Sequence, residues 1–149
     1  ENPEQSVILI DTGPLVALFD PRDHDHSTCL AVLKSVRSSP LFTAEAVLTE
    51  VFHMLRHGSK GFQAFKDFVI EGYVTVVSFN HDMRLRSFEH MHKYKDLEMD
   101  YADATLLTVA ETCKIGKVFT LDFKEFRAYQ FKKGHGYYPL ELVGSEILE

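Results

Sequence analysis

Four short apolar runs along the chain have the pattern of strands that are covered on both faces. The first, over residues 6–10, is a continuous β-branched run that stops at Asp11. Runs of this kind are typical of parallel sheets, because helices cover both sides of such sheets. The same pattern predicts strands over residues 41–43, 74–77 and 117–120. The sequence therefore predicts a buried and mostly parallel sheet.

Apolar residues recur at helical spacing in the segments between these strands. The predicted helices cover residues 15–19, 26–36, 44–58, 62–72, 81–94, 100–112 and 123–131. Thr43 is expected to cap the start of the third of these helices. Strands that alternate with helices predict an α/β sandwich, in which ligands bind at the carboxyl ends of the strands.

Length and composition indicate a single domain over residues 1–149, because one domain usually takes about 150 residues. A hydrophobic share of 45% excludes a disordered chain. The sequence contains neither an apolar run long enough to span a bilayer nor a secretory signal pattern, so a cytoplasmic protein is expected. Cys29 and Cys113 are expected to be reduced core thiols.

The net charge of −6 argues against a protein that coats nucleic acid, because such proteins are usually basic. An acidic enzyme can still act on phosphodiesters if some of its acids form a carboxylate cluster that holds metal ions. The charge therefore leaves a metal-dependent nuclease open.

Two acids directly follow predicted strands and would emerge at the same edge of a parallel sheet. They are Asp11, after residues 8–10, and Asp122, after residues 118–121. An aspartate after a strand is also a common turn residue. Because each of these acids lies near a threonine, Thr12 or Thr120, the functional and the structural interpretation are equally favoured.

Three further acids could join this edge. Glu50 borders the apolar face of a predicted helix, although a solvated glutamate is the simpler interpretation. Asp100 and Asp103 begin the helix that follows residue 99, where the helix dipole accounts for one of them. Asp103 precedes core-type residues, and an unpaired carboxylate at such a position would be costly.

Convergence of these acids would require cations. Two carboxylates about 4 Å apart repel by roughly 4 kcal/mol at an effective dielectric constant near 20. Because every candidate ligand is an oxygen atom, Mg²⁺ or Mn²⁺ would be the favoured ion. Two such ions could hold the attacking and leaving oxygens of a phosphodiester.

Four motifs along the chain resemble a known family when they are taken together. They lie at residues 8–15 (ILIDTGPL), 48–51 (LTEV), 100–107 (DYADATLL) and 119–126 (FTLDFKEF). Their order and spacing are similar to those of the PIN-domain ribonucleases, above all the VapC-type toxins of bacterial toxin–antitoxin systems. The resemblance extends from about Val7 to Leu142.

The resemblance implies a three-layer α/β/α sandwich with a four- or five-stranded, mainly parallel sheet. It also implies an endoribonuclease that depends on Mg²⁺ or Mn²⁺. The catalytic and metal-binding residues would be Asp11, Glu50, Asp103 and Asp122, with Asp100 as a further acid. Thr12 and Thr120 would orient the carboxylates, and Glu125 would be a bystander.

The implied partners are an RNA substrate, a small antitoxin protein and a second copy of the chain. Two alternatives remain beside the toxin: a stand-alone nuclease of RNA processing, and a PIN-like binding or scaffold module with little activity. The intact set of acids favours an active nuclease.

Other polar features admit simpler interpretations. No HExxH motif accompanies the eight histidines, and His90 and His92 would point apart on a helix, so a zinc site is not expected. The basic residues over 84–95 and 124–133 are either solvated faces or contacts for RNA phosphates. The aromatic residues among the second group, including Tyr129, are expected in the core.

Overall fold

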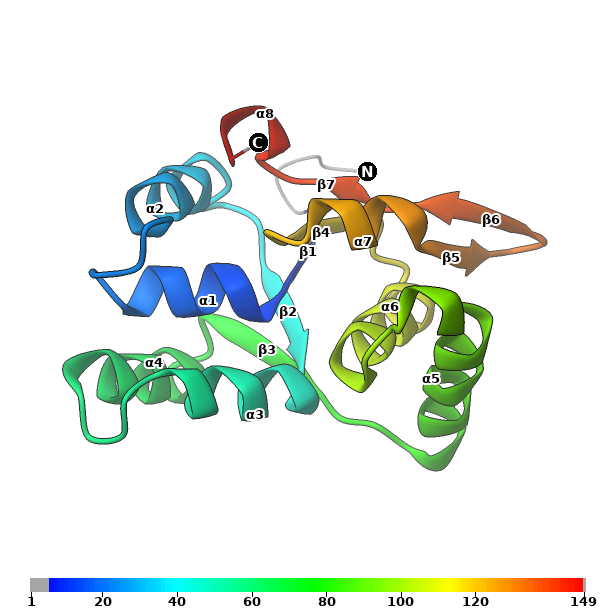
Figure 1. Ribbon diagram of the computed structural model, residues 1–149, viewed down its shortest axis with the longest axis horizontal. Coiled ribbons are helices and arrows are strands. Elements are labelled where there is room, and N and C mark those ends of the chain that lie inside the picture. Colours follow the sequence, from blue (N-terminus) through cyan, green and yellow to red (C-terminus); the bar gives the residue numbers. More distant parts are fainter. Residues whose placement is uncertain (1–5, 149) are drawn as a thin grey trace.

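The computed structural model describes residues 6–148, with a sheet of five parallel strands at its centre (Figure 1). The strands are β1 (Ile8–Ile10), β2 (Leu41–Ala44), β3 (Val74–Val77), β4 (Lys117–Phe119) and β7 (Glu141–Leu142). Their order across the sheet is β3-β2-β1-β4-β7. Every neighbouring pair is parallel, which confirms the predicted sheet. The remaining residues of the chain, 1–5 and 149, lie outside the described part.

β1 is the central strand, and its position fixes the edge at which the candidate acids emerge. All three of its residues are buried, as expected for a strand covered on both faces. Ile10 is paired with Phe119 of β4, and the Asp11 N–H donates to the Phe119 carbonyl at 3.0 Å. β1 and β4 therefore end at the same level, so Asp11 and Thr120 are neighbours.

Helices cover both faces of the sheet. The long ones are α1 (Thr12–Phe19), α2 (His26–Ser35), α3 (Glu45–Met54), α4 (Lys60–Ile70), α5 (His81–Lys93) and α6 (Tyr101–Cys113). The short ones are a 3-10 helix (Lys95–Leu97), α7 (Phe123–Ala128) and α8 (Ser145–Leu148). α1 packs against α2, α3 and α4, while α5 packs against α6. Figure 1 shows these two groups on opposite sides of the sheet, which confirms the α/β/α sandwich.

The aromatic residues of α4 belong to the core. Phe65 is fully buried, and Phe62 and Phe68 pack against the core beside it. Phe19 of α1 contacts the rings of both Phe65 and Phe68 edge-on. α4 approaches α1 so closely that a Cβ at Gly61 would lie 2.0 Å from the Phe19 carbonyl oxygen. Only glycine fits at this contact.

Some local predictions are wrong. The helix predicted over residues 44–58 ends at Met54, and the helix predicted over residues 15–19 already begins at Thr12. Thr43 does not cap α3: it lies in β2, where its hydroxyl donates to the Ile10 carbonyl at 2.9 Å. The helix predicted over residues 123–131 ends earlier, because α7 ends at Ala128. The chain then enters an antiparallel hairpin of β5 (Gln130–Lys133) and β6 (Gly136–Pro139). In β5 only Phe131 is buried, which is the alternation of a strand with one covered face.

No helix in residues 6–148 is both long enough and apolar enough to cross a bilayer. Cys29 is buried and Cys113 is partly buried, and both are free thiols, as predicted.

Candidate metal centre

Asp11 lies at the end of the central strand and is almost completely buried, with 3% of its surface exposed. It occupies the residue before α1, although its side chain does not cap that helix. The Thr120 hydroxyl donates to Asp11 Oδ2 at 2.8 Å. Burial is the main reason that the pKa of Asp11 rises to about 7, against the opposing effect of hydrogen bonds from Thr12 and Thr120.

Thr120 joins two of the candidate acids. Its side chain is fully buried, and its hydroxyl accepts a hydrogen bond from the Asp122 backbone N–H at 3.0 Å while it donates to Asp11. A single hydroxyl therefore holds the Asp11 carboxylate and fixes the backbone from which Asp122 projects. The family resemblance implied an orienting role for Thr120, which stays a prediction; the structure shows its contact with Asp11.

Asp103 lies on the first turn of α6 and is 9% exposed. Burial first, and then the negative charges of Asp11 and Asp100, raise the pKa of Asp103 to about 8. The Tyr129 hydroxyl donates to Asp103 Oδ2 at 3.1 Å.

Asp100 has a different position from Asp103. It is the N-cap of α6, and its Oδ1 accepts a hydrogen bond from the Asp103 backbone N–H at 2.8 Å. Its carboxylate therefore stabilises the start of the helix that presents Asp103. The charge of Asp100 also raises the pKa values of Asp103 and Asp122, so Asp100 lies close to these two acids.

Three carboxylates converge at the edge of the sheet. Asp11, Asp103 and Asp122 each offer an oxygen atom, and these three atoms lie within 4.8 Å of one another. Asp122 is the most exposed of the three, and burial followed by the charge of Glu125 raises its pKa. Glu125, expected to be a bystander, is therefore close enough to add to the negative field.

Glu50 approaches this group from α3. The Thr12 hydroxyl donates to Glu50 Oε1 at 2.6 Å, which links the start of α1 to the face of α3. The charge of Glu50 contributes to the raised pKa values of Asp11 and Asp122. Glu50 lies beside the three converging acids rather than among them, and Thr12 holds its carboxylate.

The donor set fits a hard divalent cation. It consists of carboxylate oxygens alone, with threonine hydroxyls behind them, and such ligands suit Mg²⁺ and Mn²⁺. Three acids with raised pKa values in one place also mark a site where negative charge is unfavourable without a cation. Asp11, Asp103 and Asp122 could bind the ion directly, and Glu50 could reach it from the side.

A second group, Asp23, His24 and Asp25, also has ligand atoms within 4.8 Å of one another. These residues form a turn before α2. The Asp25 N–H donates to Asp23 Oδ1 at 2.8 Å, and His24 pairs with Asp25 while its side chain is 92% exposed. Ordinary turn contacts account for this group.

The sequence placed Tyr129 in the core, which is correct for its ring, since the residue is 1% exposed. It did not predict that the hydroxyl contacts Asp103. One of the basic residues, Arg86, is not available to RNA as a free cation, because its guanidinium binds both oxygens of Glu111 at 2.7 and 3.0 Å.

Comparisons with known proteins agree with this fold. The chain is similar to VapC20 of Mycobacterium tuberculosis, described as a sarcin-ricin loop cleaving toxin (TM-score 0.69, 24% identity, 79% of this chain and 93% of that chain covered). It is also similar to VapBC2 from Rickettsia felis, solved bound to a DNA fragment from its promoter (0.58, 12%, 79% and 89%). A third similar structure is FitAcB from Neisseria gonorrhoeae (0.54, 18%, 78% and 88%). At these identities the likeness shows the fold.

A search of curated proteins gives no significant sequence match. The family model described as the PIN domain matches residues 8–132, and that range contains the three converging acids and Glu50. The chain therefore belongs to the PIN domain family.

Proposed function

We infer that this protein is an endoribonuclease that depends on Mg²⁺ or Mn²⁺ and that it is the toxin of a toxin–antitoxin pair. The observation that supports the nuclease most directly is the convergence of Asp11, Asp103 and Asp122 at the carboxyl edge of the sheet. Ligands bind at this edge in parallel α/β folds. Membership of the PIN domain family supports the same conclusion.

The side chains of the site have distinct roles in this proposal. Asp11, Asp103 and Asp122 would hold the cations, with Glu50 beside them. Bound there, the cations would act as Lewis acids on the scissile phosphate and lower the pKa of the attacking water. Thr120 and Thr12 keep the carboxylates of Asp11 and Glu50 in place through hydrogen bonds of 2.8 and 2.6 Å.

In this proposal a water molecule attacks the phosphate, so the ribose 2′-hydroxyl does not act as the nucleophile. The products are therefore expected to have 5′-phosphate and 3′-hydroxyl ends. Lys124 lines an open groove beside Asp122 together with Glu125 and Arg127, and we expect its ammonium group to contact an RNA phosphate there.

The Asp103→Asn variant tests the nuclease. Purified wild-type protein is expected to cut total cellular RNA at discrete positions with Mg²⁺ or Mn²⁺, and not with EDTA. The variant removes a charged ligand with little change in shape, so its cleavage rate should fall by at least about 100-fold. The rates are measured by primer extension on the cut RNA.

Asp67→Asn is the matched control, because Asp67 is an exposed acid on α4 whose carboxylate accepts a hydrogen bond from the Gln63 side chain at the surface. It should cleave at the wild-type rate. Cleavage by Asp103→Asn at the rate of Asp67→Asn would contradict the assignment of the site. No cleavage by the wild type with either metal would favour the binding or scaffold module.

The toxin assignment rests on the fold similarity to proteins that are described as VapC20 and VapBC2, together with a site that is complete in acids. The partner would be a small antitoxin that places a cationic side chain in the acidic cleft. The chain would also pair with a second copy, for which exposed Leu85 and Phe88 of α5 offer apolar surface.

Expression in a bacterial host separates a toxin from a stand-alone nuclease of RNA processing. Induction of the wild type should stop growth within a few generations, because cleavage of an essential RNA would block translation. Asp103→Asn, produced to the same level, should allow normal growth. Normal growth with a wild-type protein that cleaves RNA in vitro would favour the processing nuclease.

A further inference from the structure

Tyr129 is the one aromatic hydroxyl of the described residues that is bonded to a converging acid. It lies between α7 and β5, is 1% exposed, and donates to Asp103 Oδ2 at 3.1 Å. Its ring packs against those of Tyr94 and Phe126, with centroids 5.1 Å away in both cases. The buried hydroxyl therefore contacts the carboxylate of Asp103 from a ring that is packed on two sides.

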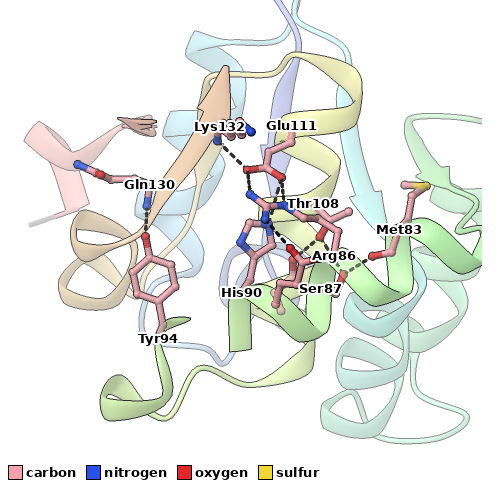
Figure 2. Close-up of polar contacts among 11 residues, drawn as sticks. Met83, Arg86, Ser87, His90, Tyr94, Thr108, Glu111, Gln130 and Lys132 are labelled. Carbon is pink, nitrogen blue, oxygen red and sulfur yellow. Dashed lines mark hydrogen bonds and ion pairs between the residues drawn. The ribbon is translucent and has the colours of Figure 1, made fainter. Parts of the chain in front are cut away.

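The residues that follow Tyr129 are tied to α6 and to the end of α5, on the far side from the acids. The Gln130 N–H donates to the Tyr94 hydroxyl at 2.8 Å, and the Lys132 N–H donates to Glu111 Oε2 at 2.7 Å (Figure 2). Both are backbone bonds of β5 to a side chain of another element. They fix the strand that begins one residue after Tyr129.

Glu111 is itself held firmly. Arg86 donates to both of its oxygens, and His90 Nε2 lies 3.2 Å from Oε1 without the alignment of a hydrogen bond (Figure 2). Burial acts to raise the pKa of Glu111, but contacts with His90 and Arg86 lower it to about 2. Glu111 is therefore a fixed anion at the end of α6 away from Asp103.

We propose that Tyr129 is a positioning residue for Asp103, and that Glu111 acts through Tyr129 by holding β5 in place. Asp103 is then fixed from both sides, since Asp100 binds its backbone N–H and Tyr129 binds its carboxylate. A carboxylate held in one orientation loses less freedom when it binds a cation, which is why groups that hold ligands affect metal affinity. The inference rests on the proposed function, because it concerns the same metal centre.

Tyr129→Phe tests the first part, because it removes the hydroxyl and keeps the buried ring. The affinity for Mn²⁺ is measured by titration calorimetry on the purified full chain and is expected to fall about tenfold. The cleavage rate at saturating Mn²⁺ should stay within about twofold of the wild type, because the ligands themselves are unchanged. A residue with a purely structural role would not produce this split.

Tyr138→Phe is the matched control, because Tyr138 lies on β6 of the same hairpin and is 50% exposed. It should bind Mn²⁺ as the wild type does. Equal Mn²⁺ affinity of Tyr129→Phe and the wild type, with both folded by circular dichroism, would overturn the proposal. A wild-type chain that binds no Mn²⁺ would overturn this proposal and the proposed function together, whereas the first result leaves the nuclease standing.

The double variant E111Q/Y129F tests the second part. E111Q alone should weaken Mn²⁺ binding by about threefold, because a neutral amide accepts the Lys132 and Arg86 hydrogen bonds less strongly. If Glu111 acts through Tyr129, the double variant should bind Mn²⁺ as Y129F does, with no further loss. A double variant weaker than Y129F by the full factor of E111Q would overturn the link between Glu111 and Tyr129.

Discussion

Asp11→Asn is expected to abolish RNA cleavage and also to make the metal-free protein more stable than the wild type. Cleavage is lost because the most deeply buried acid of the site, 3% exposed, can no longer hold a cation. Stability rises because an ionised carboxylate at this position is unfavourable without a cation. An amide of the same shape can still accept the hydrogen bond from Thr120.

The sign of the pH dependence follows from the pKa of Asp11, which burial raises from 3.8 to about 7. Between these two pH values the folded protein binds more protons than the unfolded chain. The free energy of unfolding of the wild type therefore falls as the pH rises through this window, and the contribution of Asp11 levels off above pH 7. Because the pKa of Asp103 is about 8, its contribution makes the free energy of unfolding continue to fall up to about pH 8. The amide in Asp11→Asn does not titrate, so the free energy of unfolding of the variant should decrease less with rising pH.

The size of the effect follows from the same shift. Moving this pKa from 3.8 to about 7 corresponds to about 4 kcal/mol at pH 8 and about 2 kcal/mol at pH 5. For a chain of this length that is a gain in melting temperature of about 10 °C at pH 8 and roughly half of that at pH 5. Both proteins are measured by differential scanning calorimetry in EDTA, with Asp67→Asn as the exposed control.

An Asp11→Asn protein that melts below the wild type at pH 8 would contradict this account of the site. It would mean that the ionised carboxylate stabilises the fold through Thr120, and that the cluster is a structural network. A variant that is more stable yet cleaves RNA at the wild-type rate would agree with the explanation of stability. It would show that Asp11 is not a catalytic residue.

The strands and the acids could be predicted from the sequence because both depend on local patterns. A fully apolar run such as residues 8–10 has one stable place in a soluble domain, the centre of a covered sheet. An acid at the end of such a run then has its position fixed by the strand. The prediction of Asp11 and Asp122 at one edge follows from this argument, and the parallel pairing of β1 and β4 brings it about.

Contacts made by backbone or by single atoms of core residues could not be predicted in this way. Threonine is a common N-cap residue, which is why the sequence predicts that Thr43 caps a helix. Its hydroxyl instead donates to the Ile10 carbonyl of the neighbouring strand, and that contact depends on strand order. Tyr129 has the pattern of a core residue, and its ring is one. The direction of its hydroxyl towards Asp103 depends on the hairpin of β5 and β6, which the apparent helical spacing over residues 123–131 concealed.

The division between Asp100 and Asp103 also needed the structure. Both acids begin α6, and either could cap the helix. In the fold Asp100 accepts the Asp103 N–H, which leaves Asp103 to point its carboxylate towards Asp11 and Asp122. The three-residue spacing separates the capping acid from the converging acid, because the N-cap side chain accepts a hydrogen bond from the N–H three positions later.

Mn²⁺ is expected to raise the melting temperature of the wild type far more at pH 8 than at pH 5. At a concentration one hundred times the dissociation constant, a bound ion adds about 2.7 kcal/mol, which is roughly 5–10 °C for a chain of this length. At pH 5 the carboxyls of Asp11 and Asp103, with pKa values of about 7 and about 8, are mostly protonated in the metal-free fold. Mn²⁺ must then displace those protons, so its affinity and its stabilising effect are smaller.

Asp103→Asn is the control for this measurement, since it replaces one of the three converging carboxylates by an amide of the same shape. It should show little stabilisation by Mn²⁺ at either pH, while Asp67→Asn should respond as the wild type does. A shift of the same size at pH 5 and pH 8 would mean that Mn²⁺ binds away from the buried acids, for example at the half-buried Asp23 and Asp25 before α2. A shift confined to high pH and lost in Asp103→Asn supports the buried acids as ligands, because the pKa values of Asp11 and Asp103 place their loss of protons in that window.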